Sequence, residues 1–167
     1  MKYVILGPTA SGKTAYAIEL AKKINGAVIS ADSRQVYAGM NVGTAKPQEA
    51  WLETSHSIEV PDIIDTIPHY LLNIVSLDTP YTLSYWLADA KKVISGIEKS
   101  GQTPIIVGGT MLYIDALTDG YDIPIIEPNE PLRTELDKKS PEEIYAELMK
   151  KEPDASSFIE SHNSRRI

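Results

Sequence analysis

The sequence predicts an α/β fold, a parallel sheet flanked by helices. Apolar runs at residues 2–6, 27–30 and 103–110 are rich in β-branched residues, with no polar alternation, as is typical of strands buried in parallel sheets. Helical patterns at 12–24 and 82–99 precede the second and third runs. This β-α-β order implies parallel strands joined by right-handed crossovers.

The remaining elements of the first 120 residues follow in order. Asn25-Gly26 ends the first helix. Residues 69–75 indicate a further strand, and 78–80 a turn. The helix that starts at Thr82 or Ser84 has an apolar side made of Trp86, Leu87, Ala90, Val93, Ile94 and Ile97. A last helix is expected at 111–117, with Thr110 as its N-cap.

Two stretches are predicted from composition. Residues 48–68 are acidic with two prolines, which indicates a surface excursion with a solvated His56. Residues 121–131 hold three prolines and several acids, so they predict a linker. Amphipathic helices are expected at 130–138 and 141–151, the second opened by a capping box at Ser140-Pro141-Glu142-Glu143.

Composition bounds the class of protein. With 167 residues, one domain with a small appendage is the default, and the absence of cysteine excludes disulfides and fits a cytoplasmic protein. No apolar segment approaches the ~20 residues that span a bilayer. The net charge of −7 argues against a broadly cationic surface that coats nucleic acid, but it does not exclude a local basic groove.

A glycine-rich turn follows the first predicted strand. Residues 7–14, Gly-Pro-Thr-Ala-Ser-Gly-Lys-Thr, match the P-loop pattern between a strand and a helix. Gly7 and Gly12 let successive N–H groups point at an anion, and the helix N-terminus adds partial positive charge. Lys13 supplies a full charge, and the Thr14 hydroxyl can ligate magnesium. The motif predicts a di- or triphosphate ligand.

Polar residues follow the second and third predicted strands at the same sheet edge. Asp32 can accept a proton from a substrate or hold a metal through water, or it can cap a following helix. Lys46 either reaches a phosphate or is exposed. The third strand ends in Gly108-Gly109, which allow a ligand or another backbone to approach, where many P-loop ATPases carry a magnesium-binding carboxylate.

Four motifs stand in a fixed order: GPTASGKT at 7–14, DSRQVY at 32–37, GTAKP at 43–47 and GGTMLY at 108–113. Together they closely resemble the tRNA dimethylallyltransferase (IPP transferase) family. PHYLLNIVSLDTPYTLSYW at 68–86, NEPLR at 129–133 and NSRRI at 163–167 extend the resemblance. The chain departs from the family at Tyr70 and Asn73, where the pattern has His and Asp, so no catalytic role is assigned there.

The resemblance implies transfer of a dimethylallyl group from dimethylallyl pyrophosphate to the exocyclic N6 amine of the adenosine adjacent to the anticodon in tRNA. Mg²⁺ is the implied cofactor, ligated by Thr14, and Asp32 (as base) and Thr9 are the implied catalytic residues. The implied pyrophosphate-binding residues are Gly7, Thr9, Ala10, Ser11, Gly12, Lys13 and Thr14. The implied tRNA contacts are Asp32, Ser33, Arg34, Gln35, Thr110, Arg133, Asn163, Arg165 and Arg166.

The family also implies a domain arrangement. Residues 1–120 correspond to a P-loop NTPase-like α/β core, incomplete relative to the family, and 121–167 to the start of a small helical inserted domain that clamps tRNA. Family chains normally continue past the NSRRI motif, so the chain is expected to lack the usual C-terminal part. A monomer that binds tRNA through the anticodon stem-loop, without membrane association, is expected.

Three other functions remain open from the sequence. A P-loop small-molecule kinase could use a carboxylate after the second strand to orient an acceptor hydroxyl. Prenyl transfer could instead use free adenine nucleotide as acceptor, which the pieces at 129–133 and 163–167 disfavour. The chain could also be a binding module without catalysis.

Overall fold

The computed structural model describes residues 1–161. It has two compact units, Met1–Ile125 and a second that begins at Ile126. The elements of the first unit are β1 (Tyr3–Leu6), α1 (Lys13–Ile24), β2 (Gly26–Ser30), the 3₁₀ turn η1 (Gln48–Ala50), β3 (Asp62–Ile64), β4 (Ile67–Tyr70), α2 (Leu83–Lys99), β5 (Thr103–Gly108) and α3 (Met111–Thr118). Those of the second are α4 (Glu130–Leu136), α5 (Pro141–Lys151) and the 3₁₀ turn η2 (Pro153–Ser157).

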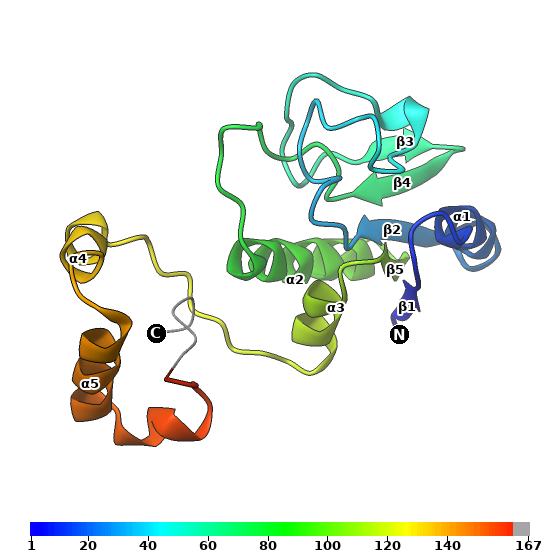
Figure 1. The fold of residues 1–167 in the computed structure, drawn as a ribbon. Helices are drawn as coiled ribbons and strands as arrows, with labels where there is room; N and C mark the ends of the chain where they lie inside the picture. Colours follow the sequence, from blue (N-terminus) through cyan, green and yellow to red (C-terminus); the bar gives the residue numbers. More distant parts are fainter. Residues whose placement is uncertain (162–167) are drawn as a thin grey trace. The chain divides into compact units, whose positions relative to one another are not determined.

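The first unit is built on a five-stranded sheet of order β1-β5-β2-β4-β3 (Figure 1). The pairs β1–β5, β5–β2 and β2–β4 are parallel, and β3 pairs with β4 antiparallel. The predicted α/β class with a mainly parallel sheet is confirmed. The strand predicted at residues 2–6 is present as β1, but its predicted burial is wrong, since β1 lies at the edge of this sheet and Leu6 is 52% exposed.

Helices cover both faces of the sheet. Alternate residues of β2 face opposite sides: Ala27 and Ile29 pack with α2 and α3, whereas Val28 packs with α1. The apolar side predicted for residues 82–99 is buried as expected in α2. Its Trp86 stacks on Tyr113 with ring centroids 4.6 Å apart and donates from Nε1 to the Ser30 carbonyl oxygen. These contacts tie α2 and α3 to the carboxyl end of β2.

The segment between β2 and α2 differs most from expectation. The strand expected at 69–75 begins at Ile67 and ends at Tyr70, because Leu71 and Asn73 have positive φ angles that no strand accommodates. The stretch 48–68 contains η1 and β3. His56, expected to be solvated, is largely covered and lies with Nε2 3.2 Å from Oδ2 of Asp62.

A buried polar network holds this segment together. Lys46 is 4% exposed, so neither alternative expected for it, phosphate contact or exposure, is right. Its ammonium donates to the Tyr37 carbonyl oxygen at 2.7 Å and to Oδ1 of Asn73 at 2.6 Å. The Asn73 amide donates in turn to the Ala50 carbonyl oxygen and to Oδ2 of Asp62. Lys46 is therefore a structural cation that joins the loop after β2 to the loop after β4.

His69 of β4 makes folding sensitive to mild acid. Burial lowers the pKa of this histidine from 6.5, outweighing its bond to the Ile67 carbonyl oxygen and the charges of Asp62 and Glu49. Below pH 6.5 the unfolded chain therefore binds a proton that the folded chain does not, until the lowered pKa is reached. The free energy of unfolding should fall as pH drops through this window, by at most about 1.4 kcal/mol per pH unit.

Urea unfolding at pH 7.5, 6.5 and 5.5 measures this loss. His69→Gln serves as the matched control, because glutamine does not titrate in this range. The wild-type chain should lose more stability than the variant between pH 6.5 and 5.5. Equal losses in both would show that His69 does not cause the effect.

The second unit contains the predicted helix pair. α5 begins at Pro141 with the expected capping box, in which Ser140 Oγ accepts from the Glu143 N–H and the Glu143 carboxylate accepts from the Ser140 N–H. α4 ends at Leu136, two residues before the expected end at 138, and begins with a cap from the Asn129 side chain. Residues 121–129 contain no helix or strand, as expected for a linker, but the first unit extends to Ile125 and Ile123 packs against its core. Within residues 1–161 no helix has the length and apolarity needed to cross a bilayer.

Candidate functional site

The glycine-rich turn connects the carboxyl end of β1 to the first turn of α1. Gly12 has φ 84° and ψ 8° at the N-cap of α1, a left-handed conformation that suits glycine. Gly12 has no capping side chain, so N–H groups of the first turn stay available to a ligand. The Lys13 ammonium donates to the Pro8 carbonyl oxygen and thereby lies across the turn. Together these groups provide the donors and charge that bind a phosphate.

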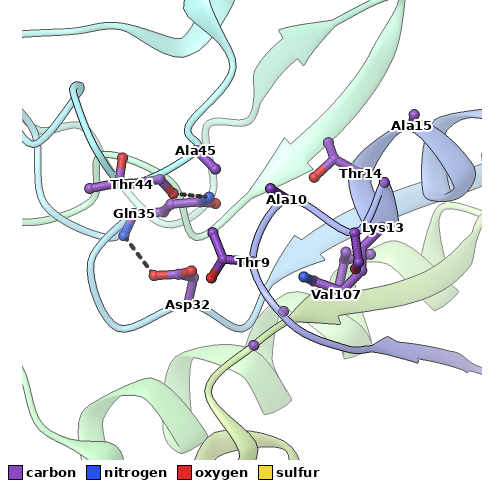
Figure 2. A pocket seen from close by; sticks show the side chains of 14 residues that line it. Thr9, Ala10, Lys13, Thr14, Ala15, Asp32, Gln35, Thr44, Ala45 and Val107 are labelled. Atoms are coloured by element: carbon purple, nitrogen blue, oxygen red, sulfur yellow. Dashed lines mark hydrogen bonds between the residues drawn. The ribbon is translucent and has the colours of Figure 1, made fainter.

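A cleft of about 300 Å³ opens beside this turn (Figure 2). Its lining residues are Thr9, Ala10, Ser11, Gly12, Lys13, Thr14, Ala15, Asp32, Gln35, Thr44, Ala45, Val107, Gly108 and Gly109. The structure thus brings eight of the sequence-predicted residues to one space: Thr9, Ala10, Ser11, Gly12, Lys13, Thr14, Asp32 and Gln35. Gly7, Ser33, Arg34 and Thr110 belong to the adjoining segments but do not line the cleft.

Asp32 is held at the rim by the turn that follows β2. Its Oδ1 accepts from the N–H groups of Arg34 at 2.9 Å and Gln35 at 3.3 Å. The alternative that Asp32 caps a helix is wrong, because residues 33–36 form turns. Its other oxygen, Oδ2, makes no hydrogen bond within residues 1–161. In Figure 2 the side chains of Asp32 and Thr9 point toward each other, and both line the cleft.

Gln35 is fixed from both ends of its side chain. Ser30 Oγ donates to its Oε1 at 3.1 Å, and its Nε2 donates to the Thr44 carbonyl oxygen at 2.9 Å. Thr44 and Ala45 therefore belong to the site, although the sequence reasoning did not select them. The GTAKP motif at 43–47 was the signal that could have found them.

Thr110 connects the end of β5 to the Asp32 turn. It occupies the N-cap position of α3, but its hydroxyl does not cap that helix as expected. Instead Oγ1 accepts from the Ser33 N–H at 3.1 Å. Gly108 is needed because a Cβ atom there would lie 2.0 Å from the Ala31 carbonyl oxygen. The close approach at this glycine is therefore to another backbone, whereas Gly109 lines the cleft.

The residues around the cleft suit a magnesium ion bound largely through phosphate. Residues 1–161 contain no cluster of three or more His, Cys, Asp or Glu side chains that could hold a metal by themselves. The Thr14 hydroxyl and the Asp32 carboxylate line the same cleft. Mg²⁺ prefers such sites, where one or two protein oxygens are completed by water and substrate phosphates.

Of the remaining predicted residues, the structure describes only Arg133, which lies in the second unit. Arg133 is on α4, with its side chain 64% exposed and Nη1 3.9 Å from the Glu130 carboxylate. A contact this long on the surface leaves the guanidinium accessible to another anion. Asn163, Arg165 and Arg166 lie outside the described residues.

Comparison with protein families gives two matches. The model of the IPP transferase family matches residues 35–167, and that of isopentenyl transferase matches residues 1–61. A tRNA dimethylallyltransferase of Dehalococcoides mccartyi is 37% identical over 168 residues, which cover 98% of this chain and 48% of the relative. That of Thermomicrobium roseum is 40% identical over 167 residues, covering 98% of this chain and 47% of the relative.

The chain is also similar to solved structures of the same kind of enzyme. The full-length tRNA isopentenylpyrophosphate transferase from Bacillus halodurans superposes with a TM-score of 0.63 at 34% identity, covering 99% of this chain and 52% of that one. A eukaryotic dimethylallyltransferase described as acting on tRNA superposes with a TM-score of 0.77 at 29% identity, covering 99% and 39%. The chain spans about half the length of the curated relatives it matches.

Proposed function

Because the chain belongs to the IPP transferase family, we propose that it transfers a dimethylallyl group from dimethylallyl pyrophosphate to the exocyclic N6 amine of the adenosine adjacent to the anticodon in tRNA. The observation that carries this proposal is the shared cleft: the phosphate-binding turn and Asp32 line one space of about 300 Å³. A donor held by its pyrophosphate there presents its allylic carbon on the side of Asp32.

The turn binds the leaving group. N–H groups at the start of α1, together with Lys13, bind the pyrophosphate oxygens, and the Thr9 hydroxyl donates to the oxygen released from carbon. The Thr14 hydroxyl would help to hold Mg²⁺, which would supply positive charge against the negative charge that grows as the C–O bond breaks. Because these groups are fixed before reaction, little reorganisation is needed when the charge develops.

Asp32 activates the acceptor. The N6 amine of adenine is a weak nucleophile because its lone pair is delocalised into the ring. As the C–N bond forms and the C–O bond breaks, the N6 proton passes to Oδ2 of Asp32 and pyrophosphate departs. Oδ1 stays bonded to the Arg34 and Gln35 N–H groups, which keeps the carboxylate in place.

The rim of the cleft and the second unit bind the RNA in this proposal. Ser33, Arg34 and Gln35 receive the target base, which must leave its stack to reach the cleft. Thr110 contacts the RNA near that base. Residues 1–120 form the catalytic core, and 121–167, with Arg133, Asn163, Arg165 and Arg166, begin a helical domain that grips the anticodon stem-loop.

One assay tests the proposed reaction. The chain is mixed with dimethylallyl pyrophosphate, Mg²⁺ and tRNA, the RNA is digested, and adenosine is analysed by mass. The expected product is dimethylallyl adenosine from the position beside the anticodon. Product from free adenine nucleotide but not from tRNA, or phosphoryl transfer from labelled ATP, would contradict the proposal in favour of the other functions that the sequence leaves open.

Replacing Lys13 by alanine should weaken pyrophosphate binding. Loss of a hydrogen bond between charged groups corresponds to about a tenfold to hundredfold weaker affinity. Calorimetric titration with inorganic pyrophosphate and Mg²⁺ measures it. Lys22→Ala is the matched control, because Lys22 is on the same helix but pairs at the surface with Asp65 at 2.6 Å. Equal losses in both variants would mean that general charge, rather than the turn, binds the anion.

A further inference from the structure

A small recess lies behind the cleft, between α1 and the sheet. It has a volume of about 20 Å³ and shares Thr14, Gln35 and Val107 with the cleft. Its other lining residues are Val28, Ser30, Pro47, His69 and Leu72. This volume exceeds the ~10–15 Å³ that one water molecule needs. The recess therefore has room for a single water beside the first turn of α1.

Strand register brings His69 to this recess. His69 of β4 pairs with Val28 of β2, and Ser30 pairs with Val107 of β5. Val28 and Val107 pack in the cluster that faces α1, so side chains in register with them lie on the same face. Thr14, in the first turn of α1, closes the recess from the helix side.

His69 brings an unpartnered acceptor to the recess. Its Nδ1 lies 2.9 Å from the Ile67 carbonyl oxygen, which can only accept, so Nδ1 carries the proton. The side chain is 3% exposed, and burial keeps the ring neutral by lowering its pKa. Its Nε2 is therefore a lone-pair acceptor, and it is buried with no hydrogen-bond partner in residues 1–161. Such atoms are usually satisfied by an ordered water.

Two hydroxyl groups complete the polar lining. Ser30 Oγ donates to Gln35 Oε1, which leaves its lone pairs free to accept. The Thr14 hydroxyl makes no hydrogen bond within residues 1–161, so its proton is free to be donated. One water could thus donate to Nε2 of His69 and to Ser30 Oγ while accepting from Thr14.

We propose that the recess binds one structural water, held by His69 Nε2 and Ser30 Oγ, that accepts the Thr14 hydroxyl proton and so turns the lone pairs of Thr14 Oγ1 toward the cleft. His69 is then a positioning residue for Thr14. This consequence rests on the proposed function, in which Thr14 ligates Mg²⁺ at the pyrophosphate. A metal-ligating hydroxyl must send its proton elsewhere, and the water provides the acceptor.

The water itself is tested by NMR on the full chain labelled with ¹⁵N-histidine, with His69→Gln used to assign the signal. Nε2 of His69 should show the ¹⁵N shift of a hydrogen-bonded acceptor nitrogen, and the ring protons should show cross-peaks to a long-lived water. The shift of a free acceptor, or the absence of those cross-peaks, would overturn the proposal. This measurement needs neither substrate nor metal.

The positioning role is tested by the Mg²⁺ dependence of pyrophosphate binding in two variants. His69→Leu removes the acceptor at similar volume, whereas His69→Gln keeps one. The Mg²⁺ concentration that gives half-maximal pyrophosphate binding should rise about tenfold over wild type in His69→Leu, and less than about twofold in His69→Gln. Tenfold is the lower end of the effect expected when a residue that orients a metal ligand is lost. Metal-free binding should be equal in both variants.

Equal Mg²⁺ dependence in the two variants would overturn the role of His69. Failure of the wild-type chain to bind pyrophosphate would instead contradict the proposed function and leave the NMR result to decide on the water. If His69→Leu does not fold, the comparison of wild type with His69→Gln and the NMR measurement still decide. A tenfold loss in a folded His69→Gln would then also count against the acceptor role.

Discussion

Replacing Asp32 by asparagine is expected to lower the rate of prenyl transfer by about 10²- to 10⁴-fold, the usual contribution of a positioned general base. The asparagine Oδ1 can still accept from the Arg34 and Gln35 N–H groups, so the turn after β2 should stay folded. What is lost is the oxygen that receives the N6 proton. Single-turnover assays with tRNA, at saturating dimethylallyl pyrophosphate, measure the rate.

Comparing Asp32→Ala with Asp32→Asn separates the two roles of Asp32, which are to hold the turn after β2 and to accept the proton. Asp32→Ala removes the carboxylate and also the cap of the turn, so it should reduce the rate at least as much and lower stability as well. Pyrophosphate binding should survive in both variants, because the turn at 7–14 is untouched. Near-normal transfer by Asp32→Asn would show that Asp32 is not the base.

The parts of the fold and site that were predictable from the sequence are those encoded by neighbouring residues. The apolar side of α2 follows from helical spacing, and the capping box at Ser140 and Glu143 from residues three apart. The P-loop pattern also fixes its own local structure, a strand, a turn and a helix. Because Asp32 follows the next strand, the rule that ligands bind at the carboxyl ends of parallel strands brought it to the same cleft.

The parts that were not predictable depend on distant segments. Nothing in the apolar run at 69–75 indicates that Leu71 and Asn73 adopt positive φ and end the strand. The burial of Lys46 requires Tyr37 and Asn73, which are 9 and 27 residues away, to converge on its ammonium. Lysine is rarely buried in proteins, so the residue type alone predicts a surface position for Lys46. The same holds for His69, whose free nitrogen becomes apparent only when β2, β4 and α1 are packed together.

Gly108 illustrates how packing decides between alternatives that a sequence leaves open. Two glycines at the end of a strand allow either a ligand or a backbone to come close. A Cβ atom at Gly108 would meet the Ala31 carbonyl oxygen at 2.0 Å, so this glycine accommodates the neighbouring backbone, whereas Gly109 lines the cleft on the ligand side. A Gly-Gly pair in the sequence is compatible with approach of a ligand or of a backbone, so only the contact with Ala31 in the folded chain distinguishes the two.

Replacing Lys46 by methionine is expected to destabilise the fold by about 3 kcal/mol. Methionine fills much of the same volume but leaves the Tyr37 carbonyl oxygen and Asn73 Oδ1 buried without their donor, at about 1–3 kcal/mol each, partly offset because a cation no longer needs to be desolvated. Burial already lowers the pKa of Lys46, against the charges of Asp62, Asp32 and Glu53. Urea unfolding at pH 7.5 measures the loss.

The same substitution should also slow prenyl transfer, because the network reaches the cleft. The Asn73 N–H donates to the Gln35 carbonyl oxygen at 3.1 Å, and Gln35 lines the cleft beside Asp32. Lys92→Met is the matched control: Lys92 is also paired, at 2.7 Å from Glu59, but its side chain is 63% exposed, so the change should affect neither stability nor rate much. If Lys46→Met lost no more stability than Lys92→Met, the buried ammonium would not be what joins the two loops. The position of Gln35 would then have to depend on Ser30 and Thr44 alone.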